Sequence, residues 1–260
     1  MWTNRSSAEV SRETLGGLST RIGVPVPPDT PRSDPQDPDA AAPPPPAAAE
    51  VFGVRVDLAS AYWAILATDG IEHGLMGPRE VPRLWDRHIL NCGVLGELID
   101  PDSTVFDVGS GAGLPGIPLA IARPDLAVTL IEPLLRRSSF LERATERLGL
   151  DNVSVVRGRA EEKSVRSSVG LADVVTSRAV APLERLAKWS APLVRGGGRM
   201  IAIKGSSAAE EIERDRAVVG RTGMSDLAVA VCGDRYLDTP TTVIIGTKLE
   251  RARGGRSGRR

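Results

Sequence analysis

Short apolar runs alternate with longer amphipathic stretches throughout the second half of this 260-residue chain. The runs are rich in Val, Ile and Leu, which is typical of strands buried on both faces, and the stretches between them have the three- and four-residue spacing of helices. This alternation predicts parallel strands joined by crossover helices, and so an α/β sheet with helices on both faces. The expected strands are residues 104–108, 127–131, 153–157, 173–176 and 199–204.

Four helices and two further strands complete the expected domain. The expected helices are residues 114–122, 136–148, 183–193 and 208–219. The last two strands, 227–231 and 242–247, have only a short connection between them, so we expect an antiparallel hairpin at one side of the sheet. The predicted fold is a Rossmann-like, mostly parallel sheet of seven strands with a terminal antiparallel hairpin.

Proline content and apolar spacing divide the chain into four parts. Residues 1–50 hold ten of the twenty prolines and little apolar surface, which predicts a disordered Pro/Ala-rich arm. Residues 51–100 have helical apolar spacing with a break near residues 70–78, which predicts a helical lead-in of two amphipathic helices. Residues 101–250 form the expected Rossmann-like domain, and residues 251–260 a basic, flexible tail.

Charge and cysteine usage exclude several classes of protein. The formal net charge is zero, but the last thirteen residues carry +5, so contact with a nucleic acid would need a local basic patch or this tail. Cys92 and Cys232 fit no metal or redox spacing, which excludes a disulfide scaffold and a zinc ribbon, and we expect no metal. No apolar run reaches 18 residues and no signal peptide is evident, so we expect a cytoplasmic protein without a membrane-spanning helix.

A glycine-rich segment, residues 105–116, follows the first expected strand and opens a helix. Its glycines allow a tight turn and close contact between a ligand and the backbone. Gly111, Gly113 and Gly116 also fit the dinucleotide pattern G-x-G-x-x-G, which is a weak signal by itself. In this strand–turn–helix context the segment predicts a nucleoside-type ligand, and NAD and S-adenosylmethionine both remain open.

Acidic residues after three successive strands favour one of these two ligands. Asp107 precedes the first glycine by two positions, where a carboxylate would repel a pyrophosphate. Glu132 closes the second strand, where a carboxylate can accept both ribose hydroxyls, and Ala160 and Glu161 follow the third strand, within reach of an adenine. Acidic residues at or after the ends of three successive strands together predict S-adenosylmethionine rather than NAD.

Residues 107–119 read Asp-Val-Gly-Ser-Gly-Ala-Gly-Leu-Pro-Gly-Ile-Pro-Leu and resemble the glycine-rich motif of the RsmG family, also called GidB or glucose-inhibited division protein B. The Leu-Pro-Gly-Ile-Pro extension separates this family from other class I methyltransferases. Residues 87–90, 177–179 and 204–205 are similar to the family as well. The resemblance covers about residues 55–250 and implies methylation of a guanine N7 in 16S ribosomal RNA of the small subunit, with S-adenosylmethionine as the donor.

The resemblance also implies which residues contact the cofactor. Its motif positions fall on Gly109, Leu114, Ala160, Glu161 and Arg178. With the positions derived above, the expected cofactor contacts are Asp107, Gly109, Gly111, Gly113, Leu114, Glu132, Ala160, Glu161 and Arg178. The family often has Asp-Ser where this chain has Asn91 and Cys92, so the role of that pair stays open, and the arm and tail lie outside the resemblance.

The segment after the fourth strand fits N7 chemistry. Residues 176–182 contain neither the Asn/Asp-Pro-Pro-aromatic motif of amine methyltransferases nor a cysteine nucleophile. Guanine N7 already presents an unprotonated lone pair, so the reaction needs alignment and no general base. Arg178 is the expected catalytic residue through positioning; it could contact the cofactor, bind guanine O6 or pair with Glu161.

Three further residues are expected on the RNA side, namely Arg87, His88 and Lys204. Lys204 could hold an RNA phosphate or a strand-end carboxylate. His88 could belong to the site or be a buried, hydrogen-bonded residue. Aromatic residues make up only 3% of the chain, which favours a single splayed guanine over a stacking platform. The preferred interpretation is a monomeric rRNA methyltransferase. The alternatives are a methyltransferase for a small molecule or a protein, an NAD-dependent oxidoreductase, and a non-catalytic nucleotide- or RNA-binding module.

Overall fold

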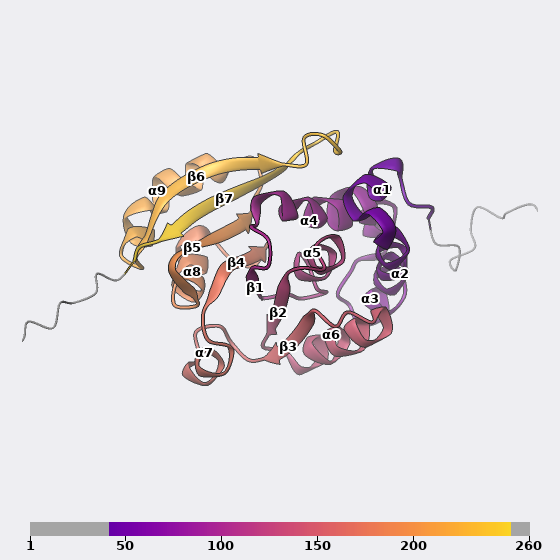
Figure 1. The fold of residues 1–260 in the computed structure, drawn as a ribbon, viewed down its shortest axis with the longest axis horizontal. Helices are drawn as coiled ribbons and strands as arrows, with labels where there is room; N and C mark the ends of the chain where they lie inside the picture. The colour runs from indigo at the N-terminus through magenta and orange to yellow at the C-terminus, as the bar shows by residue number, and fades with distance from the viewer. Residues whose placement is uncertain (1–41, 251–260) are drawn as a thin grey trace, which may run out of the picture. The chain divides into compact units, whose positions relative to one another are not determined.

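A seven-stranded sheet organises residues 42–250, the part of the chain that the structure, a computed structural model, describes (Figure 1). The strand order is β3-β2-β1-β4-β5-β7-β6, so the direction of strand progression reverses between β1 and β4. Neighbouring strands pair in parallel except that β7 is antiparallel to both β5 and β6. The strands are β1 (Thr104–Val108), β2 (Ala127–Glu132), β3 (Val153–Arg157), β4 (Ala172–Arg178), β5 (Val194–Ile203), β6 (Met224–Cys232) and β7 (Thr241–Lys248).

This topology confirms the predicted fold class, including the terminal antiparallel hairpin of β6 and β7. The largest difference in a strand is at β5, which begins at Val194 rather than at residue 199. Its glycine-rich start resembles a turn in the sequence, but Val194 pairs with Ala172 across an irregularity in the ladder between β4 and β5. The strand therefore extends through the glycines.

Helices cover both faces of the sheet, as Figure 1 shows. One face packs against α5, α6 and the lead-in helices in a single hydrophobic core. The other face packs against α7, α8 and α9 in two smaller clusters. The helices after β1 are α5 (Gly116–Ala122), α6 (Leu135–Leu148), α7 (Lys163–Val169), α8 (Leu183–Ser190) and α9 (Ala208–Gly220).

The lead-in is a series of short helical pieces rather than two regular helices. Its pieces are α1 (Pro46–Phe52), η1 (Gly53–Arg55), α2 (Val56–Ala67), α3 (Asp69–Glu72), η2 (Pro78–Arg83), η3 (Leu84–Leu90), α4 (Asn91–Gly93) and η4 (Val94–Leu98). Of these, η1, η2 and η4 are 3-10 helices and η3 is a π-helix. The interruption between α3 and η2 lies at the predicted break.

The first helix begins inside the stretch that we expected to be a disordered arm. Pro46 lies in its first turn, where a missing N–H costs little, and residues 47–49 are alanines, the strongest helix formers. Helix α1 therefore reaches five residues into the expected arm. Residues 1–41 of that arm and the expected tail, residues 251–260, lie outside the described residues.

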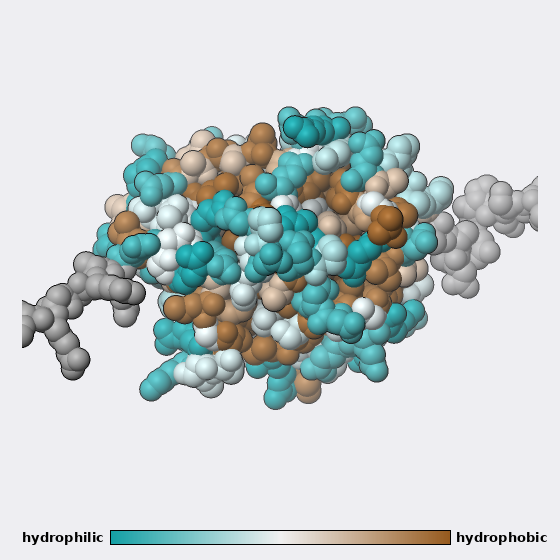
Figure 2. All heavy atoms as spheres, in the orientation of Figure 1, coloured by the Kyte–Doolittle hydropathy of each residue, from teal (hydrophilic) through white to brown (hydrophobic). Residues whose placement is uncertain are grey.

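By length and composition, one helical stretch of the described residues, Pro46–Glu72, could cross a membrane. It is interrupted at η1, where Gly53 has a φ of +54°. Tyr62 and Leu66 of this stretch are fully buried in the core shared with α5 and α6. Figure 2 shows hydrophobic residues in separate patches among hydrophilic ones on the face that it displays. The stretch is thus a core element of the α/β fold.

Gly116 lets the start of α5 lie directly on the sheet. A Cβ atom at this position would overlap Leu130 Cδ2 and come within 2.9 Å of Asp107 Oδ2. We expect Gly116→Ala to lower the free energy of unfolding by about 1–3 kcal/mol, as measured by urea denaturation. Gly220→Ala is the matched control, because a Cβ there meets no atom within 4 Å. Equal stabilities for the two variants would contradict this packing.

Candidate active site

A cavity of about 520 Å³ lies where β1, β2 and β4 end. We call it the loop cavity. Residues 109–112 after β1, 132–134 after β2 and 178–180 after β4 line it, together with His88 and Met76 from the lead-in. In open α/β sheets, ligands bind at the carboxyl ends of the strands, beside the point where the strand order reverses. The loop cavity occupies that place, between β1 and β4.

A second cavity, of about 640 Å³, adjoins it on the other side of the β4 end. We call it the β5 cavity, because residues 203–205 at the end of β5 line it, as do residues 178–182. Residues 178–180 line both cavities and form the wall between them. Two ligands could therefore meet at Arg178.

The glycine-rich loop forms the tight turn that the sequence predicts. Gly109, Gly111 and Gly113 have φ angles of +74°, +58° and +99°, which side-chain-bearing residues rarely adopt. A Cβ at Gly111 would meet only Gly109 O, at 3.9 Å, so this residue borders open space. A Cβ at Gly113 would clash with Ile117, and Gly113 does not line the loop cavity. Gly109, Gly111 and Leu114 do line it.

Asp107 lies behind the loop rather than in the cavity. Alternation along β1 turns Asp107 to the same face as Val105, beneath α5, where it is fully buried. Its Oδ2 accepts a hydrogen bond from Gly116 N at 3.1 Å, whereas Oδ1 has no hydrogen-bond partner among residues 42–250. Burial raises the pKa of this carboxyl to about 7. Asp107 thus fixes the start of α5 and keeps one acceptor unused.

Glu132 joins the ends of β1 and β2. Its side chain is almost fully buried and lines the loop cavity. Oε2 accepts a hydrogen bond from Gly111 N at 3.0 Å, and Oε1 accepts one from Leu134 N at 3.1 Å. The carboxylate therefore holds the glycine-rich loop against the end of β2.

The third expected acidic position does not reach the cavity. Ala160 is buried in the core cluster on the other face of the sheet and Glu161 is exposed, and the cavity is lined by Arg159 instead. Arg137 and Arg178 line the cavity too, so its lining has three arginines and one carboxylate. Asp107 and Glu161 therefore do not line the loop cavity, because alternation along β1 turns Asp107 away from it and Glu161 lies on an exposed turn. Their contact with the cofactor stays a prediction.

Arg178 is held by the lead-in helices. Alternation along β4 turns it to the same face as Val174, which the lead-in covers. Its Nη2 donates to His88 Nδ1 at 2.7 Å, and its Nη1 lies 3.5 Å from Cys92 Sγ. Of the three alternatives left open by the sequence, pairing with Glu161 is therefore not seen. The next residue, Ala179, has a φ of +51°, a strained backbone conformation of the kind that clusters at functional sites.

His88 links Arg178 to an acidic residue that the sequence did not single out. The histidine is 8% exposed, and its Nε2 lies 2.7 Å from Glu80 Oε2. Burial lowers the pKa of His88, and the nearby Arg178 and Arg87 lower it further, while the Glu80 hydrogen bond opposes them. The imidazole is therefore neutral near pH 7. Glu80 lies in the 3-10 helix η2, where no apolar periodicity marks it in the sequence.

The two other expected RNA-side residues line the β5 cavity. Lys204 Nζ donates to Glu211 Oε2 at 2.7 Å and to Ala181 O at 3.1 Å. Its partner is therefore a carboxylate on helix α9 rather than one at a strand end. Contact of Lys204 with an RNA phosphate stays a prediction. Arg87 is exposed and also lines a third cavity.

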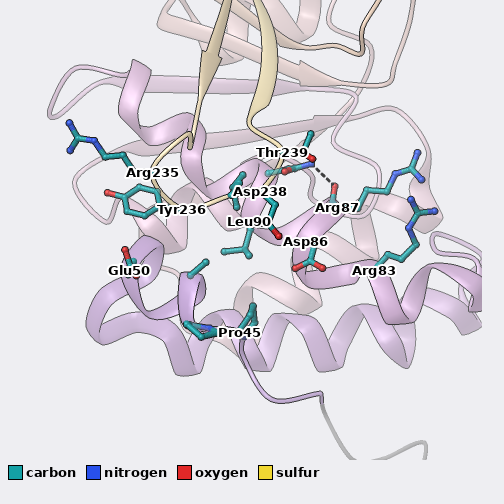
Figure 3. Close-up of a pocket in the computed structure, with 14 residues that line it drawn as sticks. Pro45, Glu50, Arg83, Asp86, Arg87, Leu90, Arg235, Tyr236, Asp238 and Thr239 are labelled. Carbon is teal, nitrogen blue, oxygen red and sulfur yellow. Dashed lines mark hydrogen bonds between the residues drawn. The ribbon is translucent and has the colours of Figure 1, made fainter.

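This third cavity, of about 760 Å³, lies between the lead-in and the connection from β6 to β7 (Figure 3). We call it the lead-in cavity. In Figure 3, Arg235 and Tyr236 lie at one end, Arg83 and Arg87 at the other, and Asp86, Leu90 and Asp238 between them. Because Arg87 lines this cavity and the β5 cavity, the two adjoin at that residue.

Comparisons with known proteins identify the family of this chain. A family profile described as "GidB: rRNA small subunit methyltransferase G" matches residues 55–238. The chain belongs to the GidB family. Ribosomal RNA small subunit methyltransferase G of Corynebacterium glutamicum is 64% identical over 198 residues, which cover 76% of this chain and 89% of that protein. The protein of the same name from Mycolicibacterium gilvum is 61% identical over 218 residues, covering 82% and 96%.

Membership of the GidB family confirms the resemblance inferred from residues 107–119. Among solved structures, a putative S-adenosyl-L-methionine-dependent methyltransferase of Methanococcus maripaludis matches 75% of this chain and 93% of its own, with a TM-score of 0.48 and 16% identity. The fold class of this GidB-family chain rests on its own strand order.

Proposed function

We propose that this GidB-family protein transfers the methyl group of S-adenosylmethionine to N7 of a guanine in 16S rRNA of the small ribosomal subunit. The observation that carries the proposal is the pair of cavities that meet at residues 178–180, in a chain of this family. The loop cavity takes the donor and the β5 cavity takes the acceptor base. We also propose that the protein acts as a monomer in the cytoplasm.

The residues of the loop cavity fit S-adenosylmethionine. Its volume lies within the roughly 300–1,000 Å³ that is typical of small-molecule sites. Glu132 ends β2 where a carboxylate can accept ribose hydroxyls, and Leu134, half exposed and lining the same cavity, offers an apolar surface to adenine. The unused Oδ1 of Asp107 lies behind the loop, so it accepts from an ammonium group through a water rather than directly. When bound, the cofactor supplies an electrophilic methyl group on a sulfonium.

The acceptor side supports N7 as the methylated atom, because the carboxylate that lines the β5 cavity and the thiol beside Arg178 are unsuited to act as base or nucleophile. Glu211 is occupied by Lys204 and by Leu183 N. Burial raises the pKa of Cys92 to about 11, which keeps it a thiol. Guanine N7 needs neither a base nor a nucleophile, only alignment with the methyl group, and alignment can contribute on the order of 7–11 kcal/mol. Arg178 orients the base by donating to O6, beside N7.

The RNA strand around the target guanine is proposed to follow Arg87 from the β5 cavity into the lead-in cavity. Arg83 and Arg235 at the two ends of the lead-in cavity suit phosphates, and Tyr236 offers a ring on which one flanking base can stack. Arg137 and Arg159 supply positive charge at the loop cavity. The path thus combines separate arginines, with Asp86 and Asp238 between those of the lead-in cavity, rather than one broad basic face.

The five arginines of residues 251–260 supply a further test of RNA binding. We expect deletion of these residues to weaken binding of small-subunit rRNA, and to make the slope of log K against log salt less steep by about 0.7–0.9 for each phosphate that the tail neutralises in the full-length protein. The affinity for S-adenosylmethionine should not change. Filter binding at several salt concentrations measures the slope. An unchanged slope would exclude the tail from RNA binding.

The proposal is tested with purified small subunits from cells that lack the gene. They are incubated with the protein and S-adenosylmethionine labelled in the methyl group, and the label in RNA, ribosomal protein and small molecules is counted. We expect label in 16S rRNA and none in ribosomal protein or small molecules. Calorimetry with S-adenosylmethionine and NAD in parallel tests the donor directly. Label in protein or small molecules alone, or binding of NAD alone, would contradict the proposed function.

A further inference from the structure

We propose that Glu80 and His88 are positioning residues that hold the Arg178 guanidinium at the wall between the loop cavity and the β5 cavity, and that His88 does not itself contact RNA. This inference rests on the proposed function, since it states how Arg178 is held for methyl transfer. It assigns a role to Glu80 and a role other than RNA contact to His88.

Arg178 forms its hydrogen bonds with neutral groups. Its guanidinium donates to His88 Nδ1 at 2.7 Å and to Cys92 Sγ at 3.5 Å, and no carboxylate bonds to it within residues 42–250. An arginine has five N–H donors, so several remain for ligands in the two cavities that it lines. Because the carboxylate of Glu80 lies beyond the imidazole, the guanidinium is fixed in place while its charge is not cancelled by a direct partner.

Glu80 selects the tautomer of His88 whose Nδ1 can accept a hydrogen bond from Arg178. Arginine only donates, so Nδ1 must accept and cannot carry a proton. The remaining proton of the neutral ring is then on Nε2, 2.7 Å from Glu80 Oε2, which accepts it. Each partner of the histidine requires the same tautomer. Without Glu80, no other hydrogen-bond acceptor within residues 42–250 holds Nε2 in this orientation.

His88 and Arg87 are adjacent in sequence but lie in different surroundings. Arg87 is exposed and lines the β5 and lead-in cavities, whereas His88 is 8% exposed and lines the loop cavity with both ring nitrogens occupied. Both lie in η3, a π-helix, and such distortions are frequent at functional sites. Arg87 is therefore placed to contact RNA, and His88 is placed to hold Arg178.

Protonation of His88 disrupts this arrangement. The protonated ring has no acceptor for Arg178 and places a second positive charge beside it. The charged groups that act on His88 are Glu80 on η2, Arg87 on η3 and Arg178 on β4. Arg178 and Arg87 lower its pKa, and Glu80 raises it. Activity should therefore fall on the acid side, and removal of the Glu80 charge should move that fall to lower pH.

Nuclear magnetic resonance tests the arrangement without any catalysis. The chain has two histidines, so the full-length protein labelled with ¹⁵N-histidine gives two imidazole patterns, and His73→Gln assigns them. We expect His88 to be the neutral Nε2–H tautomer, with a titration that moves to lower pH in Glu80→Gln and to higher pH in Arg178→Ala. The Nδ1–H tautomer, or a titration that neither variant moves, would overturn the inference.

Kinetics with three variants separates positioning from folding. Glu80→Ala should lower kcat roughly 10- to 100-fold with little change in the KM for S-adenosylmethionine, because Arg178 loses its orientation. Glu80→Gln retains an oxygen that accepts from Nε2–H, so it should restore most of kcat near neutral pH while the acid limb moves to lower pH. Glu142→Ala removes an exposed carboxylate of α6 and should behave as wild type.

The outcomes distinguish the two proposals. A wild-type protein that methylates no RNA would contradict the proposed function, while the histidine spectra would still test the arrangement. A wild-type protein that methylates rRNA, with Glu80→Ala matching it in kcat and in pH profile, would overturn the role of Glu80 alone.

Discussion

Gly111→Asp is expected to abolish binding of S-adenosylmethionine and to leave the sheet folded. Gly111 borders open space, since a Cβ there would meet only Gly109 O at 3.9 Å, so the new side chain enters the loop cavity rather than the core. Its carboxylate would lie close to Glu132, whose Oε2 accepts a hydrogen bond from Gly111 N. Occupied space and charge repulsion should weaken binding at least about 100-fold, or ~2.7 kcal/mol, measured by calorimetry.

Gly111→Ala is the matched control for that experiment. The backbone at this position has a φ of +58°, so alanine adds strain of roughly 1–2 kcal/mol but little bulk and no charge. We expect both variants to give cooperative thermal unfolding, and only the aspartate variant to lose the ligand. Calorimetry that finds wild-type affinity in Gly111→Asp would place the donor elsewhere.

Arg178→Ala is expected to lower kcat by roughly 100- to 1,000-fold, the reduction that follows removal of one donor aimed at a reacting group. Arg178 lines both cavities and donates a hydrogen bond to His88. Its removal takes away the N–H groups that orient the guanine at the place where the guanine meets the methyl donor. The affinity for S-adenosylmethionine should change less than the turnover number. Steady-state methylation of small subunits, with calorimetry for the donor, measures both.

Two substitutions control for charge and for folding. Arg178→Lys keeps the positive charge but loses the planar donor fork, so it should recover only part of kcat. Arg216→Ala removes an exposed arginine of α9 and should retain wild-type turnover. If Arg178→Ala also turned over at the wild-type rate, Arg178 would have no part in the site.

The sheet was predictable because its strands form short apolar runs. The run of β1 is almost wholly buried, as expected for a parallel strand covered on both faces, and its bounds match the prediction. The bounds of β3 match as well, although this strand lies at the edge of the sheet and its residues are half-buried or exposed. Helix α7 was missed because it has seven residues and a single buried side chain, Val165, which gives no amphipathic pattern. The lead-in differs from the two regular helices that were predicted, because its pieces are fixed by packing on α5 and α6 rather than by their own apolar periodicity.

The site was predictable where it follows directly from a strand end. The glycine-rich loop follows β1, Glu132 ends β2, and Arg178 ends β4. All three contribute to the lining of the loop cavity. The direction of Asp107 follows from alternation along β1, a signal that the predicted strand already contained. The partners of Arg178 could not be predicted, since His88 is 90 residues away in sequence and their contact depends on how η3 packs.

Identification of the methylated atom tests the central claim most directly. Small subunits from cells without the gene are methylated by the purified protein with labelled S-adenosylmethionine, and the 16S rRNA is digested to nucleosides and analysed by mass spectrometry. We expect all of the label in 7-methylguanosine, at a single guanine. Label in a different methylated nucleoside, or 16S rRNA that takes up no label while the protein binds the donor, would contradict the account.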